Sequence, residues 1–178
     1  FRRIHYHYFP GVDKYYTPFF SPTNDGRFPP RNMRDFDVEV NRGIPVVPQL
    51  LTKHGSDFLW AARILADLGY QEINLNLGCP SGTVTAKGKG SGLLSDLDGL
   101  KRLLDEIFAQ APAAISVKTR LGRNVPDEFP RLLELFDQYP IEELTVHCRV
   151  GTDFYRRPAR PEEFGLPLRE SRAAVCYN

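Results

Sequence analysis

The chain has 178 residues, of which 42% are hydrophobic and 25% are charged, and its formal net charge is +1. This composition is typical of a globular domain with one sizeable core and excludes a disordered or fibrous chain. No run reaches the roughly 18 apolar residues of a membrane span, and the chain does not start with a secretory hydrophobic segment. Three widely spaced cysteines predict neither a disulfide framework nor a zinc site. We expect a cytoplasmic protein without metal or membrane association, in which any nucleic acid is held by a local basic patch.

Short strands alternate with amphipathic helices along the chain, which begins in what reads as a helix. The expected strands cover residues 14–20, 45–51, 72–77, 114–119, 143–148 and 173–177, and residues 22–34 read as a loop. The expected helices cover residues 56–68, 96–109 and 128–138, with a short one at 161–164. Ser56 is the expected N-cap of the first of these, Gly69 its end, and Ser95 with Asp98 a capping-box-like pair before the second. Alternating strands and helices predict a parallel sheet.

Four successive strands carry polar side chains near their carboxyl ends. These are Gln49, then Asn74 and Asn76, then Ser116, Lys118 and Arg120, then His147 and Arg149. Alternation along a strand places Lys118 and Arg120 on one side and Val117 on the other. In a (β/α)8 TIM barrel such ends meet at one mouth, where active sites lie. About six of the eight strands are identifiable, so we expect an incomplete TIM barrel from a longer protein. The alternative is an open doubly wound sheet, complete as given.

Four segments carry a resemblance to a known family. They are Asn-Leu-Gly-Cys-Pro-Ser at 76–81, Gly-Lys-Gly-Ser-Gly-Leu-Leu at 88–94, Ser-Val-Lys-Thr-Arg-Leu-Gly at 116–122 and His-Cys-Arg at 147–149. In this order they resemble the tRNA-dihydrouridine synthases, flavin enzymes that reduce uridine in tRNA to 5,6-dihydrouridine. The resemblance runs from Tyr15 to Asn178. It implies a TIM barrel that acts on tRNA with FMN as cofactor and NADPH as reductant, and we expect a monomer without a protein partner.

The resemblance also assigns roles to single residues. Reduction of the C5=C6 bond of uracil needs a hydride on one carbon and a proton on the other, and a protonated thiol can supply the proton. Cys79 matches the family's proton donor to C5, with reduced FMN as the hydride source for C6. Lys118, His147 and Gln49 match residues that contact the flavin. The residues expected to bind the substrate are Asn76, Arg120, Lys87 and Lys89. Structural roles are the alternatives, such as a small buried hydrophobe for Cys79 and an ion pair for Arg120.

Two loops are expected to face the RNA. Residues 82–92 contain neither a phosphate loop nor a dinucleotide fingerprint, and we expect a mobile flap that covers the base and carries Lys87 and Lys89. Residues 154–160 interleave aromatic side chains with arginines, which suits base stacking and phosphate contact. A plain solvated loop is the alternative for each. A uridine in folded tRNA must be extruded before it can be reduced.

Some features depart from the family pattern. Cys148 stands where the family usually has glycine, and since it points away from His147 we expect only a packing change. The family's opening strand, the late loops that hold the FMN phosphate and the C-terminal helical tRNA-binding domain are not found in the sequence. These residues alone are therefore expected to bind flavin poorly or not at all, and to be inactive. Two other functions stay open: a flavoprotein similar to dihydroorotate or dihydropyrimidine dehydrogenases that acts on free pyrimidines, and a noncatalytic RNA-binding relative.

Overall fold

The computed structural model describes residues 1–23 and 25–178, with the backbone but not the side chain of residue 31. All pairs between the described strands are parallel. A small sheet joins β1 (Tyr15–Tyr16) to β2 (Val46–Val47). The larger sheet has the order β3 (Gln49–Leu50), β4 (Glu72–Asn76), β5 (Ala114–Arg120), β6 (Glu143–His147), β7 (Ala174–Tyr177). The predicted parallel sheet is confirmed, and within the described residues it does not close into a barrel.

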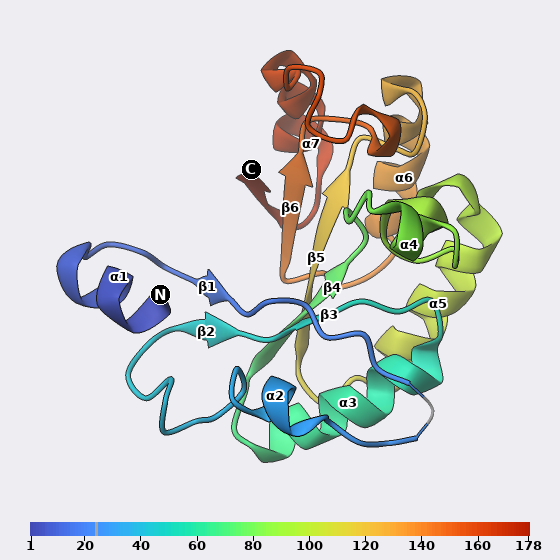
Figure 1. Cartoon of the computed structure of the whole chain (residues 1–178). Coiled ribbons are helices and arrows are strands. Elements are labelled where there is room, and N and C mark those ends of the chain that lie inside the picture. Colours follow the sequence, from blue (N-terminus) through green and yellow to red (C-terminus); the bar gives the residue numbers. More distant parts are fainter. Residues whose placement is uncertain (24) are drawn as a thin grey trace.

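The longer helices lie to one side of the larger sheet (Figure 1). They are α3 (Gly55–Asp67), α5 (Leu97–Gln110) and α6 (Phe129–Phe136), and the short helices are α1 (Arg2–Tyr8), α2 (Pro30–Met33), α4 (Gly82–Thr85) and α7 (Gly165–Glu170). Turns of 3₁₀ helix cover Gly90–Ser95, Pro126–Glu128, Gly151–Asp153 and Pro161–Phe164. No helix in residues 1–23 and 25–178 combines the length and the apolar content needed to cross a membrane.

The first two expected strands are shorter than predicted because prolines interrupt them. Pro48 separates β2 from β3, and β1 ends before Pro18. Proline has no N–H to donate to a ladder, so each segment runs beside its neighbour with gaps in the pairing. The predicted loop at 22–34 is wrong at its end, where Pro30 begins α2, in keeping with proline's preference for the first turn of a helix. Residue 24 of that segment lies outside the described residues.

Both predicted helix caps are wrong, whereas the predicted helix end is confirmed. α3 begins at Gly55, one residue before the expected cap Ser56. The N-cap of α5 is Asp96, whose carboxylate accepts a hydrogen bond from the Gly99 N–H at 2.9 Å. Ser95 belongs to the preceding 3₁₀ turn and donates to the Gly92 carbonyl instead. Gly69 has φ +99° just beyond α3, a conformation that glycine adopts without strain.

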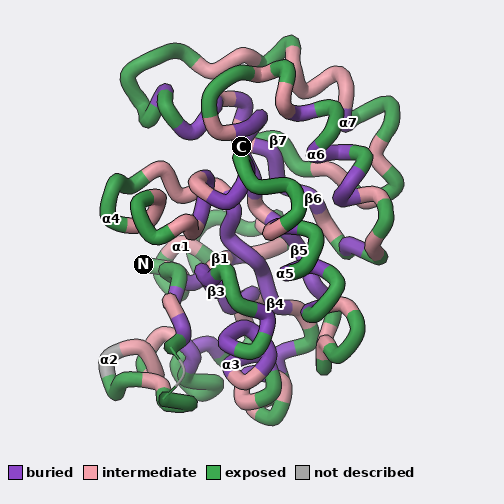
Figure 2. Tube along the Cα trace, turned by 90° about the vertical axis from the view of Figure 1, so that its right-hand side faces the viewer, coloured by how far each residue is buried: buried purple, intermediate pink, exposed green. Residues whose placement is uncertain are grey.

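The two faces of the larger sheet differ in chemistry. The face toward the helices carries buried apolar side chains: Ile73, Leu75, Ile115, Val117, Leu144 and Val146. The opposite face carries Asn74, Asn76, Ser116, Lys118, Thr145 and His147. Cys148 is fully buried in the apolar core, which confirms that it points away from His147. In Figure 2 the central strands run through the molecule as buried, purple segments. On this polar face, Asn76, Lys118 and His147 lie at or near the carboxyl ends of their strands.

Candidate functional site

A cavity of about 240 Å³ lies at the carboxyl ends of β4, β5 and β6. Its lining comprises Phe19, Asn76, Gly78, Cys79, Pro80, Lys118, Thr119, Arg120, His147, Tyr155 and Asn178. The structure thus brings together five residues predicted from the sequence: Cys79, Asn76, Lys118, Arg120 and His147. The other three, Gln49, Lys87 and Lys89, do not line it.

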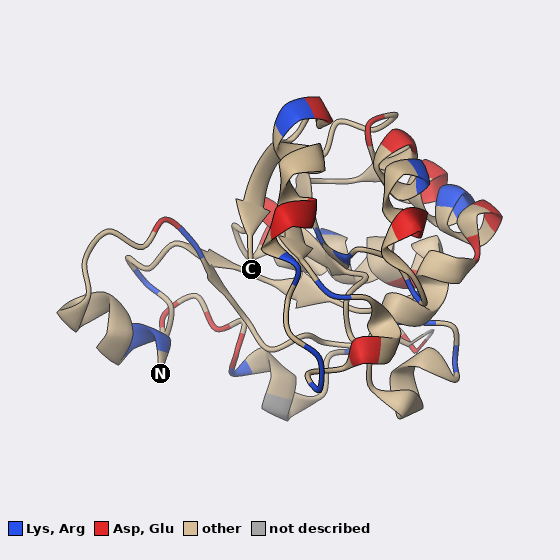
Figure 3. Ribbon diagram, turned by 90° about the horizontal axis from the view of Figure 1, so that it is seen from above, with Lys and Arg blue, Asp and Glu red and all other residues tan. Residues whose placement is uncertain are grey.

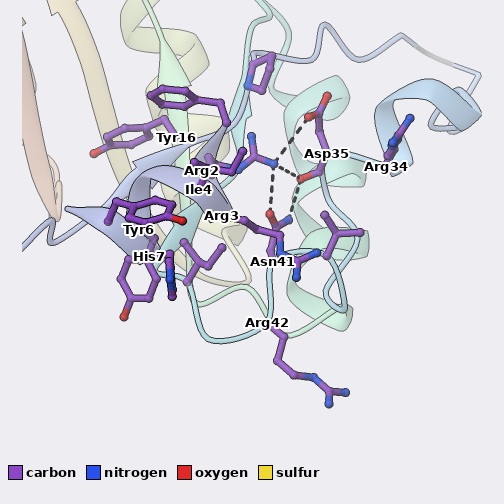
Figure 4. A pocket seen from close by; sticks show the side chains of 15 residues that line it. Arg2, Arg3, Ile4, Tyr6, His7, Tyr16, Arg34, Asp35, Asn41 and Arg42 are labelled. Atoms are coloured by element: carbon purple, nitrogen blue, oxygen red, sulfur yellow. Dashed lines mark hydrogen bonds and ion pairs between the residues drawn. The ribbon is translucent and has the colours of Figure 1, made fainter. Parts of the chain in front are cut away.

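A larger cavity of about 1270 Å³ lies between α1 and residues 34–44. Figure 4 shows Arg2 entering it, where its guanidinium donates to the Asp35 carbonyl and to Asn41 Oδ1 at 3.1 and 3.2 Å. None of the predicted site residues lines this cavity. We place the functional site at the smaller cavity, because the Cys79 thiol and three groups with lowered pKa values, Lys118, Arg120 and His147, meet there.

The Cys79 backbone is held on both sides. Asn76 Oδ1 accepts hydrogen bonds from the N–H groups of Gly78 and Cys79, each at 3.0 Å. The N–H and the hydroxyl of Ser91 donate to the Cys79 carbonyl at 3.0 and 3.2 Å. Cys79 itself is only partly buried, so its thiol borders the cavity from a fixed loop.

The segment after α4 supports this loop. Gly90 has φ +57°, and a Cβ there would lie 2.6 Å from the Cys79 carbonyl oxygen, so both conformation and contact require glycine. Ser91, Leu93 and Leu94 are buried in the 3₁₀ turn that follows. Residues 90–92, the end of the expected mobile flap at 82–92, thus belong to a packed segment that supports the Cys79 loop.

Lys118 and His147 converge on one carbonyl oxygen. Lys118 Nζ donates to the side-chain oxygen of Asn178, and His147 Nδ1 lies 3.1 Å from the same oxygen. Arg149 Nη1 donates to His147 Nε2 at 2.8 Å, so the proton of a neutral ring is on Nδ1. Burial lowers the pKa of His147, and it lowers the pKa of Lys118 to about 8. The site thus presents a lysine and a neutral histidine as paired donors.

Arg120 binds three backbone carbonyl groups in two loops. It is 2% exposed, its Nε donates to the Gly78 carbonyl at 2.8 Å, and its Nη1 donates to the carbonyls of Val150 and Phe154, both at 3.0 Å. The guanidinium carbon lies 5.2 Å from the centre of the Tyr155 ring. Arg120 thus has a structural role, as the alternative to substrate binding supposed. Its partners are backbone carbonyl groups, whereas that alternative expected an ion pair with a carboxylate.

Two exposed aromatic side chains border the cavity. Tyr155 is 72% exposed and Phe19 is 41% exposed. The ring of Tyr155 also meets the edge of His147, with centroids 5.9 Å apart. Phe154, just before it, has φ +51°, which is rare for a residue with a side chain. Tyr155 falls in the aromatic and arginine segment noted in the sequence, whereas no sequence signal identified Phe19 or Asn178.

The three predicted residues outside the cavity have other contacts. Gln49 is buried, donating to Asn74 Oδ1 at 2.8 Å and accepting from Asn76 Nδ2 at 2.7 Å. Lys89 donates to the Ser21 hydroxyl at 3.1 Å, and burial lowers its pKa. Lys87 is exposed.

A sequence model of the family described as dihydrouridine synthase (Dus) matches residues 3–163. The chain belongs to the dihydrouridine synthase family. Its similarity extends to individual curated proteins. It is 34% identical over 119 residues to a tRNA-dihydrouridine(16) synthase of Haemophilus influenzae, which covers 66% of this chain and 38% of that protein. Probable tRNA-dihydrouridine synthases of Rhodobacter capsulatus and Staphylococcus aureus are 32% and 34% identical, over 66% of this chain and 37% and 36% of their own lengths.

The matched region of this dihydrouridine synthase chain thus spans less than two fifths of each of these relatives. The match to the family model, over residues 3–163, includes most of the cavity lining, from Phe19 to Tyr155. Within the described residues, no group of three His, Cys, Asp or Glu side chains is arranged to hold a metal ion.

Proposed function

We propose that this chain is part of the (β/α)8-barrel catalytic domain of a tRNA-dihydrouridine synthase. The reaction is the reduction of uridine in tRNA to 5,6-dihydrouridine, with FMN as cofactor and NADPH as reductant. The observation that carries the proposal is the cavity in which Cys79, Lys118 and His147 meet, in a member of the dihydrouridine synthase family. The cytoplasmic location inferred from the sequence stays a prediction.

The donors around the cavity fit the polar edge of a flavin ring. Lys118 Nζ and His147 Nδ1 both point to the amide oxygen of Asn178, so they are already arranged around a carbonyl group. A flavin ring offers carbonyl oxygens of the same kind, and Lys118 and His147 would hold it there. When bound, FMN supplies the hydride for uracil C6. Gln49 retains one N–H and one lone pair, which supports its proposed part in orienting the ring.

Cys79 is the proposed general acid. Its Sγ proton passes to uracil C5 as the hydride reaches C6, and the thiolate that remains regains a proton from water. The side-chain oxygen of Asn76 accepts from two backbone N–H groups, and one of its two side-chain N–H groups donates to Gln49. The remaining N–H is available for a carbonyl oxygen of the base.

The aromatic and basic rim supports a tRNA substrate. Tyr155 and Phe19 offer exposed rings beside the cavity, and Arg156 and Arg157 are exposed next to Tyr155. In the view of Figure 3, basic and acidic residues are interspersed along the chain, in keeping with the net charge of +1. We therefore propose that tRNA is held by this local rim, with Lys87 and Lys89 as further phosphate contacts, and that the target uridine is extruded into the cavity.

The test is to incubate the purified full-length protein with NADPH and an unmodified tRNA transcript, and to measure dihydrouridine by mass spectrometry of the nucleosides. We expect dihydrouridine in the tRNA and no reduction of free uracil or oxidation of dihydroorotate. Turnover of free pyrimidines without tRNA reduction would favour the dehydrogenase-like alternative. Binding of tRNA with no reduction by flavin-loaded protein would favour the noncatalytic alternative.

A further inference from the structure

A line of buried side-chain amides runs along the polar face of the sheet and ends at Cys79. Ser116 Oγ lies 2.9 Å from Asn74 Nδ2, Asn74 Oδ1 lies 2.8 Å from Gln49 Nε2, and Gln49 Oε1 lies 2.7 Å from Asn76 Nδ2. Asn76 Oδ1 then accepts from the N–H groups of Gly78 and Cys79. The line crosses three neighbouring strands, β5, β4 and β3, before it returns to the loop after β4.

All four side chains in this line lie away from solvent. Asn74 and Ser116 are 0% exposed, and Gln49 and Asn76 are each 7% exposed. At such depth a missing partner costs more than it would at the surface, because water cannot replace it. Each amide in the line has both of its ends bonded.

The two hydrogen bonds from backbone N–H groups to Asn76 determine the donor and acceptor of every other hydrogen bond in the line. Backbone N–H groups only donate, so Asn76 must turn its oxygen toward Gly78 and Cys79 and its nitrogen toward Gln49. Gln49 must then accept with its oxygen and donate with its nitrogen, and Asn74 must do the same one step further on. The hydroxyl of Ser116 ends the line, since it can accept or donate.

We propose that Asn74 and Ser116 are positioning residues for the Cys79 thiol. Neither lines the cavity, and both act by fixing the amide of Gln49, which fixes Asn76, which holds the backbone on which the thiol stands. With Asn74 replaced by an apolar side chain, Gln49 loses its acceptor and is free to turn. The loop then loses a fixed partner. The catalytic consequence rests on the proposed role of Cys79 as proton donor, whereas the positioning itself does not.

The test is the rate at which iodoacetamide alkylates each cysteine of the full-length protein, measured by peptide mass spectrometry without tRNA or FMN. Cys176 is exposed and serves as the internal reference. Cys148 is buried, and burial raises its pKa to about 11, so its labelling reports global unfolding. For Asn74→Leu we expect Cys79 to react about tenfold faster relative to Cys176, the ratio that ~1.4 kcal/mol of lost local stability gives, with Cys148 still protected.

Thr145→Val is the matched control, because Thr145 is buried on the same face but donates to Glu143 outside the line. We expect it to leave Cys79 labelling unchanged. Asn74→Asp should restore slow labelling, since a carboxylate still accepts from Gln49 and the Ser116 hydroxyl can turn to donate to it. If Asn74→Leu does not fold, Ser116→Ala decides by the same readout, with faster Cys79 labelling expected.

Unchanged Cys79 labelling in folded Asn74→Leu or Ser116→Ala would overturn the inference. So would equal acceleration of Cys79 and Cys148, or the same acceleration in Thr145→Val, because each would indicate general loosening. In tRNA reduction, we expect Asn74→Leu to lower kcat and leave KM for tRNA unchanged. A wild-type protein that reduces no tRNA, together with accelerated labelling in Asn74→Leu, would defeat the proposed function and leave the positioning intact.

Discussion

Burial sets the protonation of the two donors that meet beside Cys79. Lys118 stands near the end of β5 with its ammonium group partly withdrawn from water, and its pKa falls to about 8. His147 faces it from β6, and burial also lowers its pKa, which favours the neutral ring. Their side chains share the Asn178 oxygen. Near neutral pH Lys118 therefore contributes a cation to the cavity and His147 a neutral N–H donor.

The lowered pKa of Lys118 predicts a pH dependence of flavin binding. Lys118 is charged below about pH 8 and loses its charge as the pH rises through that value, well below the usual lysine pKa of about 10.4. We expect the affinity of the full-length protein for FMN to fall across this range, and the fall to be absent in Lys118→Met. The measurement is a fluorescence titration with FMN at a series of pH values.

Lys101→Met is the control for that titration, because Lys101 is exposed on α5 and pairs with Asp105. It should keep the wild-type pH dependence. An FMN affinity that stays flat through pH 8 in the wild type would show that the charge of Lys118 does not hold the ligand.

At the scale of elements, the 3₁₀ turn Gly90–Ser95 packs against the Cys79 loop and supports it. It brings Gly90 against the Cys79 carbonyl and Ser91 into two hydrogen bonds with the same oxygen. The turn is anchored in the core by Leu93 and Leu94. A segment rich in glycine thus serves here as a close-fitting support.

Replacement of Gly90 tests this support. Gly90→Ala adds a methyl group 2.6 Å from the Cys79 oxygen and places alanine at φ +57°, which alone costs about 1–2 kcal/mol. We expect a loss of at least that size in the free energy of unfolding, measured by urea denaturation, and a fall in tRNA reduction. Gly82→Ala in α4 is the matched control, with no atom within 4 Å of the new methyl group. Equal stability and activity of the two variants would contradict the account.

The sequence predicts an element well when the residues of that element alone determine its bounds, and less well when a neighbouring segment determines them. The strands β4 to β7 were predicted within one residue at each end, because their apolar runs are bounded by turns. The strand predicted at 14–20 is longer than β1, and the single strand predicted at 45–51 is divided into β2 and β3 at Pro48. Sequence alone does not show whether the missing N–H of a proline falls at a position that pairs with a neighbouring strand. The cap of α5 was misplaced by one residue, because Ser95 and Asp96 are both good caps and the preceding 3₁₀ turn decides between them.

The residues of the candidate site were likewise predictable only where the strands themselves position them. Cys79, Lys118 and His147 could be grouped from the sequence, because the carboxyl ends of parallel strands meet at one edge. The contacts of Arg120 could not be predicted in this way. Its partners Val150 and Phe154 lie in a loop, and no sequence pattern indicates the path of that loop. Phe19 reaches the cavity from beyond β1, in the other sheet, so alternation along one strand could not place it.

At the scale of the whole molecule, one face of the larger sheet packs into the hydrophobic core and the other carries the side chains of the candidate site. The helices cover the apolar face, and the polar face carries the amide line to the cavity. Membership of the dihydrouridine synthase family is shown over residues 3–163. The reaction assigned to the cavity is our proposal, and its central claim is that Cys79 donates the proton.

The most direct test of that claim is the single-turnover rate of dihydrouridine formation in an unmodified tRNA by full-length Cys79→Ala, with Cys176→Ala as the control thiol outside the cavity. General acid catalysis contributes about 10²–10⁴-fold, so we expect Cys79→Ala to be slower by at least 10²-fold and Cys176→Ala to match the wild type. A Cys79→Ala variant that reduces uridine as fast as the wild type would contradict the proton-donor role.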